Sequence, residues 1–519
     1  MGMREGYTLP GNAATFRVTR TLLLLGVFLL GVAQIALLPP FEGYDETAHW
    51  SYIQQFADTL QVPVYGVDTL SADVEAYGGP LAGPGQPYRD ALARPVPAEG
   101  AEPTRYAPGR QSNWQAQHPP LFYAVMALPY RALAGLDWRL NFFGLRLVSW
   151  SIAFAGFAWG AVLAQGVLRR RGIFGARLLV PLLWPLVFPE FFPEFARLTN
   201  DGLCLLLAAC VWALLLRWLE RGASWPRALA LGVALGAGLW TKAFFLPVTA
   251  GVAALLFWLA WRQRRGGLMA VAVPALALLL AGGWYLAKWR LTGSVSGADD
   301  LIAMDRDGGL WAGLRAHFTV LALLRRLDGL LLGFAWAGTW SFVQPSRWWL
   351  LPVTLLPLLS GALYLARARR LDAAALSPLV LLLPVLAGLL YHLFAMLAAP
   401  ELGFGTPGWY LHIFCGPLAV VLVLGWAGRA MWPLLGYGVA LSAALAAMQA
   451  TFFAGCLTRV DTAKVSLVEA GECLGALAPL RRVALPEVAA VAAVAAVLVL
   501  AFAAGRYAQE ERIIGTIRR

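Results

Sequence analysis

Apolar runs long enough to cross a bilayer recur along the whole chain, and this pattern limits the possible folds more than any other feature. Runs of this kind form helices in a membrane, because backbone N–H and C=O groups in lipid must pair within the protein. The composition agrees: of 519 residues, 59% are hydrophobic and 13% charged, and the mean hydropathy is +0.64. The sequence therefore predicts an all-α polytopic membrane protein and excludes a soluble enzyme.

Arginines indicate how the chain threads the membrane, because short cytoplasmic loops collect positive charge. The formal charge of +12 is therefore attributed to topology, and no nucleic-acid partner is predicted. Arg17 and Arg20 precede the first apolar run, which places the N-terminus in the cytoplasm, and the segment 40–117 that follows carries ten acidic residues against four arginines, as an outer loop does. About twelve spans keep the later basic clusters inside, near 21–39, 142–167, 178–193, 201–218, 228–241, 243–261, 268–287, 348–366, 375–398, 409–428, 432–453 and 484–504. We expect an inner (plasma) membrane protein with both termini cytoplasmic.

The predicted single transmembrane domain, 1–519, carries three outer segments: 40–141, 288–347 and 454–483. The apolar stretch 118–135 lies in the first of them. Counting it as a span would move Arg169, Arg170 and Arg171 to the outside, so we expect an interfacial helix there. The stretch 309–343 mixes apolar residues with charged ones and is also predicted to lie at the interface, among membrane lipids.

Residues capable of acid–base chemistry gather on the predicted outer side. The stretch "FEGYDETAHW", Phe41–Trp50, places Glu42, Asp45, Glu46 and His49 just after the first span. Asp45 is predicted either as a catalytic carboxylate or only as the N-cap of the helix that follows. Glu46 and His49 are three residues apart and share a helix face, where they could orient Asp45, bind an acceptor or hold a divalent ion.

The chain resembles the GT-C glycosyltransferases, and most closely the branch of protein O-mannosyltransferases and lipid A aminoarabinose transferases. The stretches that carry the resemblance are "GYDETAHWSYIQQFADTLQVPV", "QHPPLFY", "RLTNDGLCLLL", "GGWYLAKWRLTGS" and "PGWYLHIFCGPLAVVL", which occur in the family's order. One departure is Gly408-Trp409-Tyr410, where related bacterial chains often have Gly-Arg-Tyr. That departure puts a donor-phosphate contact from this arginine in doubt.

The resemblance implies transfer of a sugar from a polyprenyl-phosphate carrier to an acceptor outside the cytoplasm, with inversion at the anomeric carbon. The predicted catalytic residues are Asp45, as the base, and Glu46. Cations must meet the negative charge of the leaving phosphate, and the candidates are Lys242, Arg290, Arg325, Arg326 and Arg347. Predicted pocket residues for the acceptor or substrate are His49, His118, Asp201, Tyr410 and His412. Simpler roles stay open: Lys242 as a snorkelling side chain, Asp201 as part of a helix start capped by Thr199 or Asn200, and His118 as a surface residue without a role.

Two further features are predicted from the same topology. Cys456 and Cys473 lie together in an outer segment, where they form either a disulfide or two free thiols. Whether a divalent metal ion takes part, and which protein, lipid or glycan accepts the sugar, the sequence leaves open. The alternative functions are a polymerase or ligase that uses a diphosphate-linked glycan, which favours a large late arginine-rich loop, and a lipid-linked sugar transporter or flippase, which favours ionisable groups within the spans.

Overall fold

A computed structural model describes residues 10–77, 105–296, 308–339, 345–400, 405–426, 431–453 and 485–517. Its elements, in chain order, are α1 (Pro10–Leu37), α2 (Glu46–Thr59), β1 (Thr69–Ser71), α3 (Ala72–Tyr77), β2 (Pro108–Ser112), η1 (Trp114–Gln117), α5 (Leu121–Ala132), α6 (Trp138–Arg170), η2 (Gly175–Leu179), α7 (Val180–Val187), α8 (Phe191–Phe195), α9 (Asp201–Arg221), α10 (Trp225–Leu239), α11 (Phe245–Gln263), α12 (Gly267–Thr292), α14 (Gly309–His317), α15 (Val320–Ala335), α16 (Arg347–Arg367), η3 (Ala368–Arg370), α17 (Ala373–Ala398), η5 (Gly408–Phe414), α18 (Cys415–Gly425), α19 (Met431–Phe453) and α22 (Pro486–Ile517). Helices dominate the described chain, as predicted.

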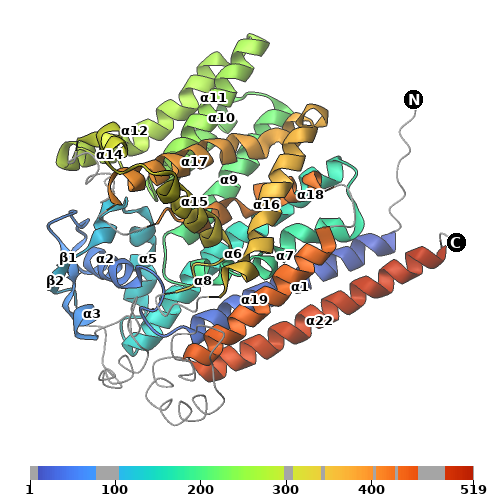
Figure 1. Ribbon diagram of the computed structural model, residues 1–519, viewed down its shortest axis with the longest axis horizontal. Helices are drawn as coiled ribbons and strands as arrows, with labels where there is room; N and C mark the ends of the chain where they lie inside the picture. The colour runs from blue at the N-terminus through green and yellow to red at the C-terminus, as the bar shows by residue number, and fades with distance from the viewer. Residues whose placement is uncertain are drawn as a thin grey trace.

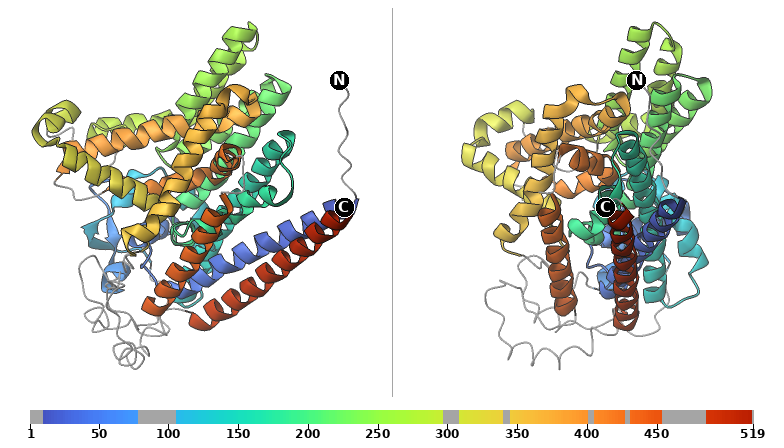
Figure 2. Two further views of the ribbon diagram at one scale, coloured as in Figure 1. Left: turned by 45° about the vertical axis from the view of Figure 1, so that its right-hand side comes forward. Right: turned by 90° about the vertical axis from the view of Figure 1, so that its right-hand side faces the viewer.

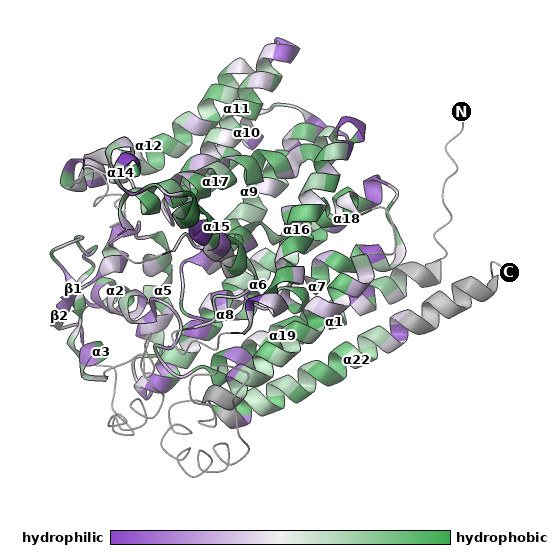
Figure 3. Ribbon diagram, in the orientation of Figure 1, coloured by the Kyte–Doolittle hydropathy of each residue, from purple (hydrophilic) through white to green (hydrophobic). Residues whose placement is uncertain are grey.

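Ten helices among the described residues are long and apolar enough to cross a membrane. They correspond to ten of the twelve predicted spans. The other two, predicted at 178–193 and 228–241, are shorter apolar helices, Gly175–Val187 and Trp225–Leu239. The first ends at Val187, because the chain turns extended at Phe188 and re-forms a helix only at Phe191. Figure 3 shows the long helices coloured mainly as hydrophobic, as a multi-pass membrane protein requires.

The first and last described helices form an antiparallel pair at one side of the molecule (Figure 1). The N–H of Leu485, just before α22, donates to the carbonyl oxygen of Ala36 at the end of α1. Further along the pair, Gly26 of α1 lies against the side chain of Leu500. The views in Figure 2 show this pair running together along its length.

Helix α6 is the centre of the packed helices and contacts α1, α9 and α18. Its neighbours come close where α6 has glycine: Gly160 faces Gly416 of α18, and Gly156 lies against the backbone of Leu206 in α9. A Cβ built on Gly156 would lie 2.5 Å from the Leu206 nitrogen. This contact leaves no space for a methyl group.

Gly156→Ala is therefore expected to destabilise the protein by about 1–3 kcal/mol, because α6 and α9 must move apart. The matched control is Gly166→Ala in the same helix, where a Cβ would meet nothing within 4 Å. That control is expected to be neutral or slightly stabilising, since alanine favours a helix over glycine. Unfolding of the two variants in detergent measures the difference, and equal midpoints would contradict this view of the α6–α9 contact.

The segment between α1 and α6 folds into a compact unit with its own apolar cluster, which includes Trp50, Tyr52, Phe122 and Tyr123 from α2 and α5. It also contains a two-stranded antiparallel sheet, β1 with β2, which the sequence did not predict. In Figure 1 this unit lies at the left, and in Figure 3 hydrophilic residues gather there. The stretch 118–135 belongs to this unit. Its helix, α5, has 12 residues and is too short to span a membrane.

Candidate functional site

Asp45 stands at the N-cap position of α2 in a left-handed backbone conformation, with φ of 63°. A non-glycine residue held there costs roughly 1–3 kcal/mol, which the surrounding structure must supply. Its side chain makes no capping hydrogen bond, so the alternative prediction that Asp45 serves only as a helix cap is wrong. Instead, Oδ1 accepts a hydrogen bond of 2.9 Å from Nε1 of Trp114 in η1, and the residue is half-buried.

Tyr44 fixes the backbone next to Asp45 through three distant segments. Its carbonyl oxygen accepts from Nη1 of Arg197 at 2.5 Å, and its hydroxyl donates to the carbonyl oxygen of Ala337 at 3.0 Å. Its ring stacks on Trp409, with 6.1 Å between the centroids. The strained conformation of Asp45 is thus supported from outside its own helix.

Glu46 is fully buried and paired with Arg146 of α6. The distances are 2.8 Å from Arg146 Nε to Oε1 and 2.5 Å from Nη2 to Oε2. The N–H groups of Leu198 and Gly43 donate to the same two oxygens. Arg146 also donates to carbonyl oxygens at the end of α1, those of Ile35, Leu38 and Pro39. Both carboxylate oxygens of Glu46 therefore accept hydrogen bonds from the protein. The carboxylate joins α2 to α1 and α6, and does not bind a ligand together with His49.

Lys242 lies in the turn between α10 and α11, where it is buried. Its Nζ donates to Oδ1 of Asp201 at 2.7 Å and sits 4.2 Å from the ring centroid of Tyr410. Burial lowers the pKa of the Lys242 ammonium, but the adjacent Asp201 carboxylate outweighs burial, so the net pKa is raised. Because its side chain is enclosed and paired, Lys242 does not snorkel. The structure brings together Lys242, Asp201 and Tyr410, which the sequence had placed in the site separately.

Asp201 opens α9, and Thr199 supports it locally. The Thr199 hydroxyl accepts from the Asp201 N–H at 3.2 Å and donates to Oδ2 of Asp201 at 3.3 Å. Asn200 makes no capping bond, and both polar atoms of its side chain are buried without a hydrogen-bond partner in the described part of the chain. Such atoms cost free energy until an acceptor and a donor reach them.

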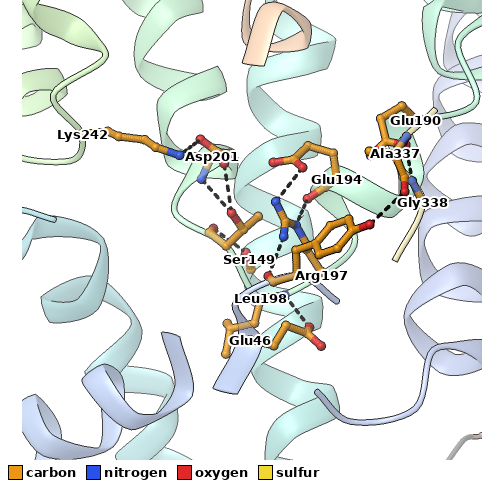
Figure 4. A network of polar contacts seen from close by, with 12 residues as sticks. Glu46, Ser149, Glu190, Glu194, Arg197, Leu198, Asp201, Lys242, Ala337 and Gly338 are labelled. Carbon is orange, nitrogen blue, oxygen red and sulfur yellow. Dashed lines mark hydrogen bonds and ion pairs between the residues drawn. The ribbon is translucent and has the colours of Figure 1, made fainter. Parts of the chain in front are cut away.

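Three charged residues that sequence reasoning missed complete the network in Figure 4: Glu190, Glu194 and Arg197. All three are buried. Arg197 Nη2 donates to Oε2 of Glu194 at 2.7 Å, and Oε2 of Glu190 accepts the N–H groups of Ala337 and Gly338 at 2.6 and 2.8 Å. Burial raises the pKa of Glu190 to about 8 and raises that of Glu194 well above its usual range.

A signal for these residues is present in "PEFFPEFARLTND", where charges recur four and then three positions apart within an apolar run. Side chains at such spacing share one helix face, and uncompensated charges in an apolar run are costly. The pattern therefore indicates paired, inward-facing charges just before Asp201.

The histidines separate into two groups. His49 Nδ1 lies 3.0 Å from the Tyr123 hydroxyl, and burial lowers the pKa of its ring far below the usual value. Burial likewise lowers the pKa of His118 to about 3, and the positive charges of Lys242 and Lys288 act in the same direction. Both rings are therefore neutral, and both lie in the unit that holds Asp45.

Both ring nitrogens of His412 form hydrogen bonds within the protein. Its Nδ1 accepts from Trp184 Nε1 at 3.0 Å, so its Nε2 carries the proton and donates to the Phe334 carbonyl oxygen at 2.8 Å. The ring stacks on Phe334 with 4.5 Å between centroids. The structure thus places His412 in a packing contact between α7, α15 and η5, away from the pocket role predicted for it.

Most of the predicted phosphate-binding arginines lie apart from this network. Arg290 and Arg325 are exposed, Arg347 pairs with Asp328 at the surface at 2.9 Å, and Arg326 lies 3.5 Å from the carbonyl oxygen of Met396. The neighbour of Arg290 is different: Lys288 is buried, donates to the Ala116 carbonyl oxygen at 2.7 Å and lies over Trp284 at 4.7 Å. Lysine occurs three times in the chain, and two of the three lie buried here.

The described residues hold no group of three His, Cys, Asp or Glu side chains placed to bind a metal ion. Cys204, Cys210 and Cys415 are free thiols. The predicted disulfide candidates, Cys456 and Cys473, lie outside the described residues.

No family model matches the chain, and no curated protein does either. Among solved structures, the chain is similar to ArnT from Cupriavidus metallidurans in the apo state, with 16% identity and a TM-score of 0.47 over 95% of this chain and 78% of that one. For the same protein bound to undecaprenyl phosphate the values are 15%, 0.46, 96% and 78%. An oligosaccharyltransferase from Archaeoglobus fulgidus, tethered to an acceptor peptide, gives 12%, 0.34, 91% and 55%.

Proposed function

We propose that the protein is a membrane glycosyltransferase of the GT-C type. It moves a sugar from a polyprenyl-phosphate carrier to an acceptor on the extracytoplasmic face. The observation that carries this proposal is the placement of Asp45, a half-buried carboxylate in a strained conformation that accepts from Trp114. Its neighbour Tyr44 is held from three segments, and the Tyr44 carbonyl accepts from Arg197 of the network that includes the buried Lys242 and Asp201. Strain and buried charge of this kind concentrate at active sites.

In this mechanism Asp45 is the general base. Trp114 occupies Oδ1 and sets the rotation of the carboxylate, so that Oδ2 receives the proton of the acceptor hydroxyl. The acceptor oxygen forms a bond to the anomeric carbon as the bond from that carbon to the carrier phosphate breaks, which inverts the configuration. Glu46 takes a positioning role, because its pair with Arg146 fixes the start of α2 beside Asp45.

The polyprenyl phosphate leaves with growing negative charge, which fixed cations stabilise. Among the described residues, Lys242 and Lys288 are buried, and the charges of both act on His118. Lys288 bonds a carbonyl oxygen and pairs with no carboxylate in the described part of the chain, so it is the freer of the two to take a phosphate oxygen. The buried side-chain amide of Asn200 beside Asp201 has no hydrogen-bond partner among the described residues, and it fits a sugar hydroxyl, which both donates and accepts.

The network lies where α9 begins and where α10 meets α11, at helix ends near the unit between α1 and α6. By the arginine pattern these ends face outward, in an inner membrane protein with cytoplasmic termini. A transporter would place such groups near the middle of the spans, so their position favours the transferase.

The test is sugar transfer by membranes from cells that express the protein, supplied with a panel of radiolabelled polyprenyl-phosphate sugars and, in parallel, polyprenyl-diphosphate sugars. The proposal expects label to move from a monophosphate carrier to an endogenous acceptor. Consumption of the diphosphate carriers alone would establish the polymerase or ligase alternative. Movement of intact carrier across sealed vesicles without transfer would establish the flippase alternative.

A further inference from the structure

The carboxyl groups of Glu194 and Asp201 meet inside the network, and neither residue is exposed by more than 2%. They are close enough for a side-chain hydrogen bond between them. Figure 4 shows the two groups on facing sides of the network, Asp201 toward Lys242 and Glu194 toward Arg197. Ionised carboxylates only accept hydrogen bonds, so a direct contact between two of them requires a proton on one.

The remaining contacts decide which group carries the proton. Asp201 accepts from Lys242 through Oδ1 and from Thr199 through Oδ2, so both of its oxygens act as acceptors. Glu194 uses only Oε2, which accepts from Arg197, while its buried Oε1 has no donor within reach in the described part of the chain. A proton on Oε1 turns this orphaned atom into a donor toward Asp201.

The surrounding charges favour the same assignment. Glu194 interacts electrostatically with the charges of Arg197, Asp201 and Glu190. The charge of an ionised Glu194 would also raise the pKa of three neighbours: Tyr44, Cys204 and Tyr410. With Glu190, Glu194, Asp201 and Asp45 all ionised, Arg197 and Lys242 would face four carboxylates. A neutral Glu194 removes one negative charge from a site that must also admit a phosphate.

We propose that Glu194 is held as a neutral carboxylic acid that donates its proton to Asp201, and that it thereby positions the single carboxylate that pairs with Lys242. The role of the Asp201–Lys242 pair in sugar transfer rests on the proposed function. The protonation state of Glu194 is independent of that function. Glu194 is a positioning residue, because it acts on the site through Asp201.

The experiment is infrared difference spectroscopy of the purified full-length protein in lipid at neutral pH, comparing wild type with Glu194→Gln. The expected result is a carbonyl-stretch absorption band of protonated carboxyl groups in wild type, from which the component of Glu194 is lost in the variant while the component of Glu190, whose pKa burial raises to about 8, remains. Asp201→Asn is expected to shift this band, since it replaces the acceptor of the hydrogen bond. Glu220→Gln, at the exposed end of α9, is the matched control and leaves the band unchanged.

A spectrum of Glu194→Gln that retains the full carboxyl band would overturn the proposal. A large fall in the unfolding midpoint of Glu194→Gln would also overturn the proposal. If Glu194 were ionised, the substitution would remove a counter-charge of Arg197, whereas the substitution of a neutral Glu194 removes no charge. In transfer assays Glu194→Gln, which can still donate an N–H to Asp201, should exceed Glu194→Leu by about tenfold. Equal rates would contradict the positioning role, and an absence of transfer in wild type would count against the proposed function alone.

Discussion

Asp45→Asn is expected to lower the rate of sugar transfer by about 10²–10⁴-fold, the usual contribution of a general base. Asparagine keeps the size of the side chain and can still accept the hydrogen bond from Trp114, but its amide does not take up the proton of the acceptor hydroxyl. It also tolerates the left-handed conformation that residue 45 adopts, so the local fold is preserved. Initial rates of label transfer in membranes, normalised to the amount of folded protein, measure the effect.

Asp68→Asn is the matched control, since Asp68 lies in the same segment and accepts hydrogen bonds from Gln55 and the Val64 N–H. It should transfer at close to the wild-type rate. If Asp45→Asn is as active as this control, Asp45 is not the base, whatever the family of the protein.

Glu46→Gln is expected to cost about 3–5 kcal/mol of stability, the largest effect on folding among the substitutions considered. The change leaves the Arg146 guanidinium, only 2% exposed, without a counter-charge in the interior. It also weakens the acceptor of the Leu198 and Gly43 N–H groups, so three segments lose their common anchor. The unfolding midpoint in detergent or lipid measures the loss.

The matched control is Glu220→Gln, which removes the carboxylate of an equally short ion pair with Arg170 at 2.5 Å. Those side chains are 37% and 46% exposed, so water replaces the lost partner and the expected cost is about 0–1 kcal/mol. Similar unfolding midpoints for the two variants would mean that Arg146 pairs with another group or with water. That result would contradict the role of Glu46 in joining α2 to α1 and α6.

The spans were predictable because the bilayer imposes a minimum length on every crossing helix. Hydropathy could not reveal where a run stops being helical. The run predicted at 178–193 is interrupted at Phe188, and that interruption creates the short helix α8 with Glu194 and, just before it, Glu190. The predicted span included Glu190 and ended one residue before Glu194, whereas in the structure Glu194 pairs with Arg197 and Glu190 accepts hydrogen bonds from the Ala337 segment.

The site itself was predictable only in part. Asp45, Lys242 and Asp201 could be named from the resemblance and from the cost of a charge beside apolar runs. The partner of Glu46 could not, since Arg146 lies 100 residues away inside the predicted span 142–167, and the sequence does not show which carboxylate it meets there. Arg290 and Lys288 were equally hard to distinguish from the sequence, because they lie two positions apart on one helix. The packing of α12 determines that Lys288 is buried and Arg290 exposed.

The antiparallel pairing of α1 with α22 has a consequence for biogenesis. Helix α1 leaves the ribosome about 450 residues before α22 does, yet the two are neighbours along most of their length. During synthesis the face of α1 that α22 later covers must remain in contact with lipid or with an insertion factor. The contacts of α1 with α6, such as the bond from Trp150 Nε1 to the Phe28 carbonyl oxygen, form much earlier. Assembly can therefore complete the Asp45 network before the last helix arrives, with α22 closing the bundle as its final step.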